Sequence, residues 1–117
     1  MSTVKEHFEK SSPAVRAAYD AILKAARALG PVEEEPKKTS IHLANGTAFA
    51  GIATRKDALL LTLKSSEKIN SPRVHKAEQT SANRWHVEIR IAKPGEVDRE
   101  LRAWLKAAYD LSQTTRR

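Results

Sequence analysis

The sequence predicts an α+β domain, in which an antiparallel sheet of about five strands carries an N-terminal and a C-terminal helix packed on one face. Three observations support this fold class. Apolar residues recur at helical spacing near both ends of the chain, they alternate with polar residues between positions 32 and 91, and turn-forming pairs such as Asn45-Gly46 separate the alternating segments. With 117 residues, the chain is expected to form a single domain over residues 1–117, with a frayed tail at residues 113–117.

Residues 13–29 are predicted to form the first helix. Ser12 and Pro13 suit a helix start, because serine accepts from free N–H groups and proline needs no partner at the first position. Gly30-Pro31 ends the segment. The apolar positions recur at steps of three and four and form one stripe: Val15, Tyr19, Ile22, Ala26 and Leu29. This stripe is expected to dock on the sheet.

Strands are expected at residues 40–44, 47–54, 58–64 and 85–91, with a weaker signal at 75–81. The clearest is 85–91, which is apolar at odd positions and polar at even ones. The leucine-rich segment 58–64 indicates a central strand or burial on both faces. Residues 65–74 form a polar crossing that fits either a loop or a short helical turn.

A second helix is expected after Pro94-Gly95, where acidic residues complement the positive end of a helix. Its apolar stripe contains Val97, Leu101, Trp104, Leu105, Ala108 and Leu111. Two amphipathic helices therefore bracket one sheet, and both are expected to cover the same face.

The net charge of +7 comes entirely from the middle of the chain. Residues 36–93 contain eleven Lys/Arg and four Asp/Glu, while the flanking segments contribute −1 and +1 and cancel. Because this region is predicted to be β structure, the basic excess is expected on the sheet and its loops, where it would attract an anionic partner.

Several classes of function lack a signal in the sequence. There are no cysteines, so thiol chemistry and disulfides are excluded, and no metal site or cofactor is expected. The serine pairs lack the Gly-x-Ser-x-Gly context of an exposed nucleophile. No apolar run approaches the roughly 18 residues of a membrane span, and residues 1–6 lack the apolar core of a signal peptide, so a cytoplasmic protein is expected.

Several short segments carry a family resemblance. They include His7-Phe8, Ala28-Leu29-Gly30-Pro31, Phe49-Ala50, Arg55-Lys56-Asp57, the strand Trp85-His86-Val87-Glu88-Ile89-Arg90, and Trp104-Leu105 in the last helix. In composition and spacing the whole chain resembles domain-of-unknown-function family 5655. The resemblance implies the boundaries of a single domain and supplies no catalytic residue.

The basic residues of the predicted sheet provide the leading functional hypothesis, a non-enzymatic module that binds an anionic ligand such as nucleic acid. Polar positions of the strands and the crossing segment supply the candidate binding residues: Lys38, His42, Arg73, Lys76, His86 and Arg90. Because Phe49 and Trp85 are the only aromatic residues of this region, a base-stacking platform is not expected, and contacts would be mainly to phosphates.

Three alternatives remain open at the level of sequence. The basic set also fits a solvated surface without a ligand. An uncovered sheet face could pair with a second copy or another protein. His86 and Glu88 lie two apart on one strand, so they could act as an acid/base pair of a small enzyme, although an ordinary polar strand surface is the better explanation because the sequence offers no third ligand.

Overall fold

The computed structural model describes residues 3–114 and contains one six-stranded antiparallel sheet with the order β1-β2-β3-β4-β6-β5. The strands are β1 (Glu33–Pro36), β2 (Ile41–Asn45), β3 (Thr47–Thr54), β4 (Leu59–Ser65), β5 (Val74–Ser81) and β6 (Arg84–Ile91). The helices are α1 (Val4–His7), α2 (Pro13–Arg27), the 3₁₀ turn η1 (Pro94–Glu96) and α3 (Arg99–Thr114). The predicted α+β class is confirmed, with six strands in place of about five.

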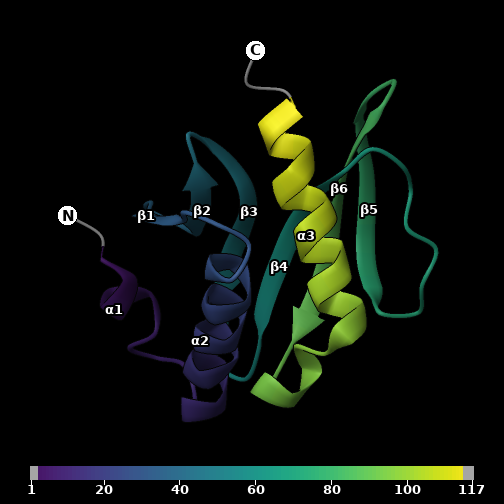
Figure 1. Ribbon diagram of the computed structural model, residues 1–117. Coiled ribbons are helices and arrows are strands. Elements are labelled where there is room, and N and C mark those ends of the chain that lie inside the picture. Colours follow the sequence, from purple (N-terminus) through teal and green to yellow (C-terminus); the bar gives the residue numbers. More distant parts are fainter. Residues whose placement is uncertain (1–2, 115–117) are drawn as a thin grey trace.

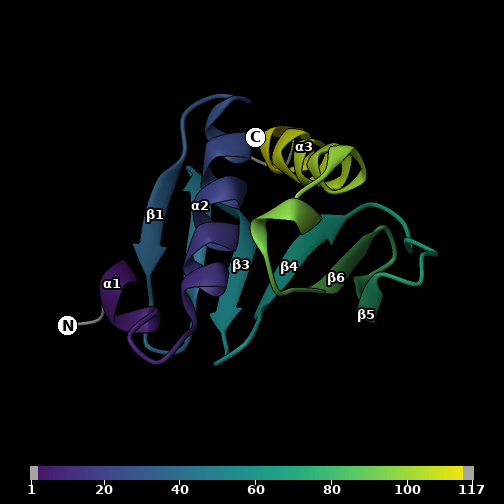
Figure 2. The ribbon, with the colours of Figure 1, turned by 90° about the horizontal axis from the view of Figure 1, so that it is seen from below.

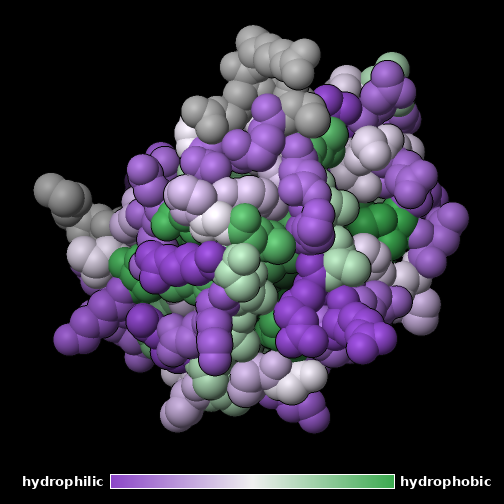
Figure 3. All heavy atoms as spheres, in the orientation of Figure 1, coloured by the Kyte–Doolittle hydropathy of each residue, from purple (hydrophilic) through white to green (hydrophobic). Residues whose placement is uncertain are grey.

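The two long helices lie on the same face of the sheet, as predicted. Figure 1 shows α2 and α3 in front of the strands, and Figure 2 shows that they form one layer above the sheet. Hydrophilic residues cover much of this helical side of the molecule (Figure 3). No described helix covers the opposite face of the sheet, which leaves that face available for contacts.

Each long helix packs on the sheet through the stripe that the sequence predicts. The fully buried residues of α2 include Tyr19 and Ile22, and those of α3 include Leu101 and Ala108. Helix α3 extends to Thr114, and residues 115–117 of the expected tail lie outside the described part. None of the described helices is both long and apolar enough to cross a membrane.

The central strands alternate between core and opposite face. Leu59, Leu61 and Leu63 of β4 are buried under the helices, as are the odd-numbered residues Val87, Ile89 and Ile91 of β6. The register pairs these two sets directly, since Leu61 lies opposite Ile89. Even-numbered residues of both strands therefore point away from the helices.

Strand β1 was not predicted, because its sequence Glu-Glu-Glu-Pro lacks alternation and consists of residues that are depleted in strands. It lies at the edge of the sheet, where proline is tolerated. Glu34 ties it to α2, accepting a hydrogen bond from the Tyr19 hydroxyl and lying 3.6 Å from the Arg27 guanidinium. Burial and the nearby Glu34 carboxylate raise the pKa of the Tyr19 hydroxyl, which keeps it a donor.

The hairpin between β2 and β3 contains one irregularity. Gly46 forms the turn with φ of 78°, as expected for the Asn-Gly pair. Leu43 pairs with Ala50 and Ala44 with Ala48, so Phe49 is an extra residue in β3. Its buried ring contacts the ring of Tyr109 in α3 edge to face, with 5.1 Å between the centroids. The bulge thus supplies an additional aromatic side chain to the core.

Candidate functional site

We call the sheet face opposite α2 and α3 the open face. Its side chains form rows that the strand register defines. The central row crosses all six strands in the order Glu35, His42, Gly51, Thr62, Glu88 and Lys76. Because Gly51 has no side chain, this row is interrupted in the middle of the sheet.

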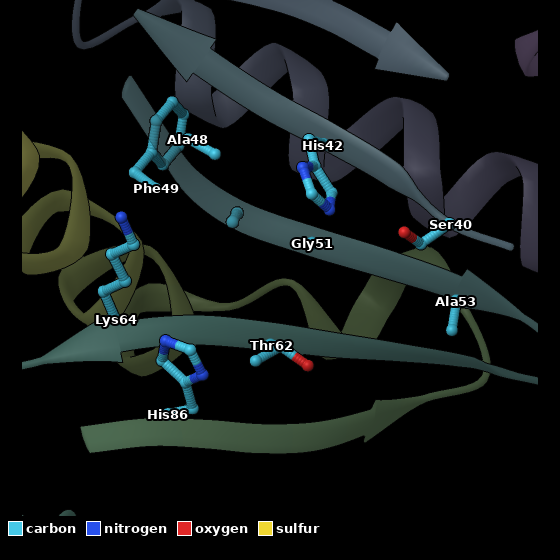
Figure 4. Close-up of a pocket in the computed structure, with 10 residues that line it drawn as sticks. Ser40, His42, Ala48, Phe49, Gly51, Ala53, Thr62, Lys64 and His86 are labelled. Atoms are coloured by element: carbon cyan, nitrogen blue, oxygen red, sulfur yellow. The ribbon is translucent and has the colours of Figure 1, made fainter. Parts of the chain in front are cut away.

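The interruption forms a shallow depression of about 300 Å³, which we call the central hollow. Small residues of β3 form its floor, namely Ala48, Gly51 and Ala53. Polar side chains from neighbouring segments stand around it: Ser40, His42, Thr62, Lys64 and His86. Figure 4 shows the imidazoles of His42 and His86 on opposite sides of the floor, with Lys64 beside His86.

The polar side chains of the central hollow share one property. Among residues 3–114, none of these five side chains has a hydrogen bond or ion pair with another protein group, and all except His86 are only partly exposed. Some other polar side chains of comparable exposure are paired, as Asn45 is with Tyr109 at 2.9 Å. The hollow therefore gathers donors and acceptors that are available to a bound molecule.

The open face as a whole is not strongly basic. The bases Lys64, Lys76, Arg84 and Arg90 share it with the acids Glu33, Glu35, Glu78 and Glu88. Lys76 lies 3.7 Å from the Glu78 carboxylate on the same strand. The basic excess of the middle segment consequently lies largely on the loops, where Lys38, Arg55 and Lys56 are exposed.

The structure brings four of the six sequence-predicted binding residues onto the open face: His42, Lys76, His86 and Arg90. Lys38 lies in the turn between β1 and β2, at one end of the sheet. Arg73 lies just before β5 and does not join the open face, because its guanidinium is engaged on the helical side.

Arg73 connects the crossing segment to the start of α3. Its guanidinium donates to Asp98 at 2.8 Å and Glu100 at 3.2 Å, and it lies over the ring of Trp104. Partial burial opposes its charge, but the bonds to Asp98 and Glu100 outweigh this effect and raise the pKa of the Arg73 guanidinium. The bonds from the Leu101 N–H and from Arg73 lower the pKa of the Asp98 carboxyl. These contacts hold the Arg73 guanidinium against α3 and η1, away from the open face.

The histidines do not converge on one point. His42 and His86 lie on strands three spacings apart, which is about 14 Å. His75 lies on the outer strand β5, at an irregularity in its pairing with β6. Within the described part of the chain no group of three or more His, Cys, Asp or Glu side chains could hold a metal ion.

His86 and Glu88 do lie on the same face of β6, in adjacent rows of the sheet. A small depression beside them is lined by Thr62, Lys76 and Glu78 as well. Over residues 3–114, no hydrogen bond joins the imidazole to the Glu88 carboxylate. The geometry therefore provides two neighbouring polar groups without the direct contact of an oriented acid/base pair.

Sequence reasoning missed Thr62, Lys64 and the floor of the hollow. Thr62 and Lys64 are polar residues at even positions of the leucine-rich segment that forms β4, so the period of two in a strand could have indicated their shared face. The glycine inside β3 was a second signal, because glycine in a strand interior often marks a close approach of another group. Neither signal shows which neighbouring strand completes the site.

Over residues 3–114, the fold is a small α+β domain with one helical layer on the sheet and the open face on its other side. A sequence model of the family described as "Domain of unknown function (DUF5655)" matches residues 4–112. The chain therefore belongs to this family, and the family's description assigns no activity. No curated protein and no solved structure matches the chain significantly.

Proposed function

We propose that this domain is a non-enzymatic binding module that holds a small anionic ligand over the central hollow of the open face. The observation that supports the proposal is the group of nitrogen-bearing side chains at the hollow, His42, Lys64 and His86. They surround a floor without large side chains, and none has a partner among the described residues. Lys64 supplies an ammonium group, and each imidazole supplies ring nitrogens that can donate a hydrogen bond.

The dimensions of the hollow favour a small molecule over a nucleic-acid strand. A volume of about 300 Å³ is at the lower end of ligand sites in proteins. The mixture of acids and bases on the surrounding open face would not attract a long polyanion. The methyl groups of Ala48 and Ala53 offer an apolar floor, so the proposed ligand combines a flat body with a carboxylate or phosphate.

The experiment is a titration of ¹⁵N-labelled protein with three probes that separate these properties. Adenosine monophosphate has a flat base and a phosphate, benzoate has a flat ring and a carboxylate, and inorganic phosphate has no flat body. We expect the first two probes to shift the amide signals of Gly51, Thr62 and Lys64, and inorganic phosphate to act more weakly. The proposal is wrong if no probe shifts these signals.

Variants test whether binding uses the hollow. Gly51→Leu should fill it and abolish the shifts, because a Cβ at Gly51 has room on the open face, meeting only the His42 ring at 3.8 Å. Lys64→Ala should weaken binding of the anionic probes about tenfold, which corresponds to the loss of one charge-assisted hydrogen bond. Gly95→Leu and Lys24→Ala are the matched controls, since both positions lie outside the hollow. Equal binding by Gly51→Leu and the wild type would contradict the proposal.

A cytoplasmic location forms part of the same proposal. The chain contains no cysteine, which fits a reducing compartment but does not require one. Fractionation of cells that express the protein, with an antibody as the probe, would test this location directly.

A further inference from the structure

A second hollow lies at one end of the sheet, and it shares no residue with the central hollow. It has a volume of about 540 Å³, and three separate segments form its walls. The link between α1 and α2 supplies Lys10, the β1–β2 turn supplies Lys38, and the β3–β4 turn supplies Arg55 and Lys56. Figure 2 shows α1 beside the end of β1, where these segments meet. We call this depression the turn-end hollow.

Hydrogen bonds hold the walls of the turn-end hollow in place. The Thr54 hydroxyl donates to the His7 carbonyl at 2.6 Å, and the Ser11 hydroxyl donates to the Arg55 carbonyl at 2.7 Å. The Ser12 N–H donates to the Lys56 carbonyl at 2.8 Å. These bonds connect the α1–α2 link to the β3–β4 turn. The backbone that carries the basic side chains is therefore ordered before any ligand binds.

The end of α1, just before the link, is also fastened to the β1–β2 turn. An imidazole nitrogen of His7 lies 2.7 Å from the Lys37 carbonyl oxygen, the distance of a hydrogen bond donated by the ring. The Lys37 ammonium itself points to Glu35, at 3.7 Å. Hydrogen bonds to backbone carbonyls consequently connect all three walls, and the hydroxyl groups of Ser11 and Thr54 are already used within the protein.

The cations that line the turn-end hollow are not neutralised. Lys10, Lys38 and Lys56 are exposed, and none of their ammonium groups has a hydrogen bond or ion pair within residues 3–114. By contrast, the lysines at positions 37, 76 and 106 each lie within 4 Å of a carboxylate. Arg55 uses one nitrogen on the Thr54 carbonyl and retains its other donors.

Two carboxylates also line the rim. Glu6 accepts a hydrogen bond from the Thr3 hydroxyl, which turns one of its oxygens toward α1, and Glu9 is exposed. The four basic residues exceed these two acids, so the hollow keeps a positive excess. This excess is stronger than that of the open face, where acids and bases balance.

We infer that the turn-end hollow binds phosphate groups of an extended polyanion. Several separate ammonium groups around a wide depression match a ligand with several charged groups, because each phosphate offers multiple acceptor oxygens. A monocarboxylate would engage only part of the set. A nucleic-acid backbone and a free polyphosphate present this same chemistry, and the site lacks the aromatic side chains that would read bases.

The test measures fluorescence anisotropy of a labelled 20-nucleotide single-stranded DNA, with tripolyphosphate as competitor, over a salt series. The variant Lys10→Ala/Lys38→Ala/Lys56→Ala is compared with a control of equal charge loss on the helices, Lys24→Ala/Arg99→Ala/Arg102→Ala. We expect the first variant to weaken binding at least tenfold at low salt and the control to weaken it less than threefold. The slope of log affinity against log salt should fall by about 2, as expected for three lost phosphate contacts.

The outcomes distinguish the possible sources of phosphate. If tripolyphosphate does not displace the DNA at matched phosphate concentration, the ligand is a nucleic-acid backbone. If tripolyphosphate displaces the DNA efficiently, the ligand is a free polyphosphate. Absence of binding by both probes at 20 mM salt, or equal losses in the variant and its control, would overturn the inference. The amide signals of Gly51, Thr62 and Lys64 report on the central hollow separately, so a failure there and a failure at the turn-end hollow can be told apart.

Discussion

Replacement of Gly30 by alanine should destabilise this fold strongly, although the residue is only partly buried. Gly30 follows the C-terminus of α2 with φ of 155°, a region that L-amino acids rarely adopt. A Cβ at this position would overlap the hydroxyl oxygen of Tyr109 and approach its Cζ at 3.3 Å. That hydroxyl accepts from Asn45 at 2.9 Å and donates to the Pro31 carbonyl at 3.2 Å. The new methyl group therefore strains the backbone and displaces a bonded hydroxyl.

The magnitude follows from these two effects. Holding a non-glycine residue in a sparsely populated backbone region costs about 1–3 kcal/mol. Loss of each of the two hydrogen bonds at the Tyr109 hydroxyl adds about 1 kcal/mol. Alanine also lowers the conformational entropy of the unfolded chain, which offsets about 0.5–1 kcal/mol of the destabilisation. The net loss is about 2–4 kcal/mol. For 117 residues the unfolding entropy is about 0.25 kcal/mol per degree, so Tm should fall by about 8–16 °C.

Thermal and urea unfolding of the wild type and a small set of variants would test this prediction. Gly95→Ala is the matched control, because a Cβ added at Gly95 would meet nothing within 4 Å and the φ of this residue is not positive. Its stability should stay within about 0.5 kcal/mol of the wild type. Tyr109→Phe removes the hydroxyl, so adding Gly30→Ala to it should cost only about 1 kcal/mol. Equal losses from Gly30→Ala in both backgrounds, or a loss no larger than that of Gly95→Ala, would refute the reasoning.

The remaining predictions concern the core and the Arg73 contacts. Leu61→Ala should lower the free energy of unfolding in urea by about 2–5 kcal/mol because the side chain is fully buried. Leu60→Ala, on the open face, should lower it by less than about 1.5 kcal/mol. Similar losses in the two variants would contradict the assignment of faces. Arg73→Ala should lower Tm by several degrees, and Arg73→Lys should lower it by less, because lysine keeps the charge but cannot reproduce the guanidinium bonds to both Asp98 and Glu100. An unchanged Tm in both variants would show that these contacts do not stabilise the fold. Asp98 has a lowered pKa, so its charge stabilises the fold above its unfolded pKa, and this contribution disappears as pH falls through the folded value. The stability difference between the wild type and Asp98→Asn should therefore shrink between about pH 5 and pH 2, and a difference independent of pH would contradict this linkage.

Much of the fold was predictable because its elements carry their own periodicity. The alternation in residues 85–91 identified β6 and also its buried face, and the stripes of α2 and α3 placed both helices on one side of the sheet. Such patterns are local, since a strand or helix repeats its environment every two or 3.6 residues. Strand β1 escaped prediction because its pairing with β2 and the contact between Glu34 and Tyr19 stabilise it, and neither appears in its own four residues.

The candidate sites were less predictable, because they depend on which strands and turns become neighbours. The sequence by itself determined the two amphipathic helices, the alternating strands, the Gly46 turn and the basic character of the middle segment. Only the tertiary structure decided that Arg73 faces the helical side and that Gly51 lies between His42 and Thr62. It also decided that Lys10, Lys38 and Lys56 line the same hollow. The physical reason is that periodicity is encoded within one element, whereas a site combines side chains from elements far apart in the chain, which only the packing of the sheet brings together.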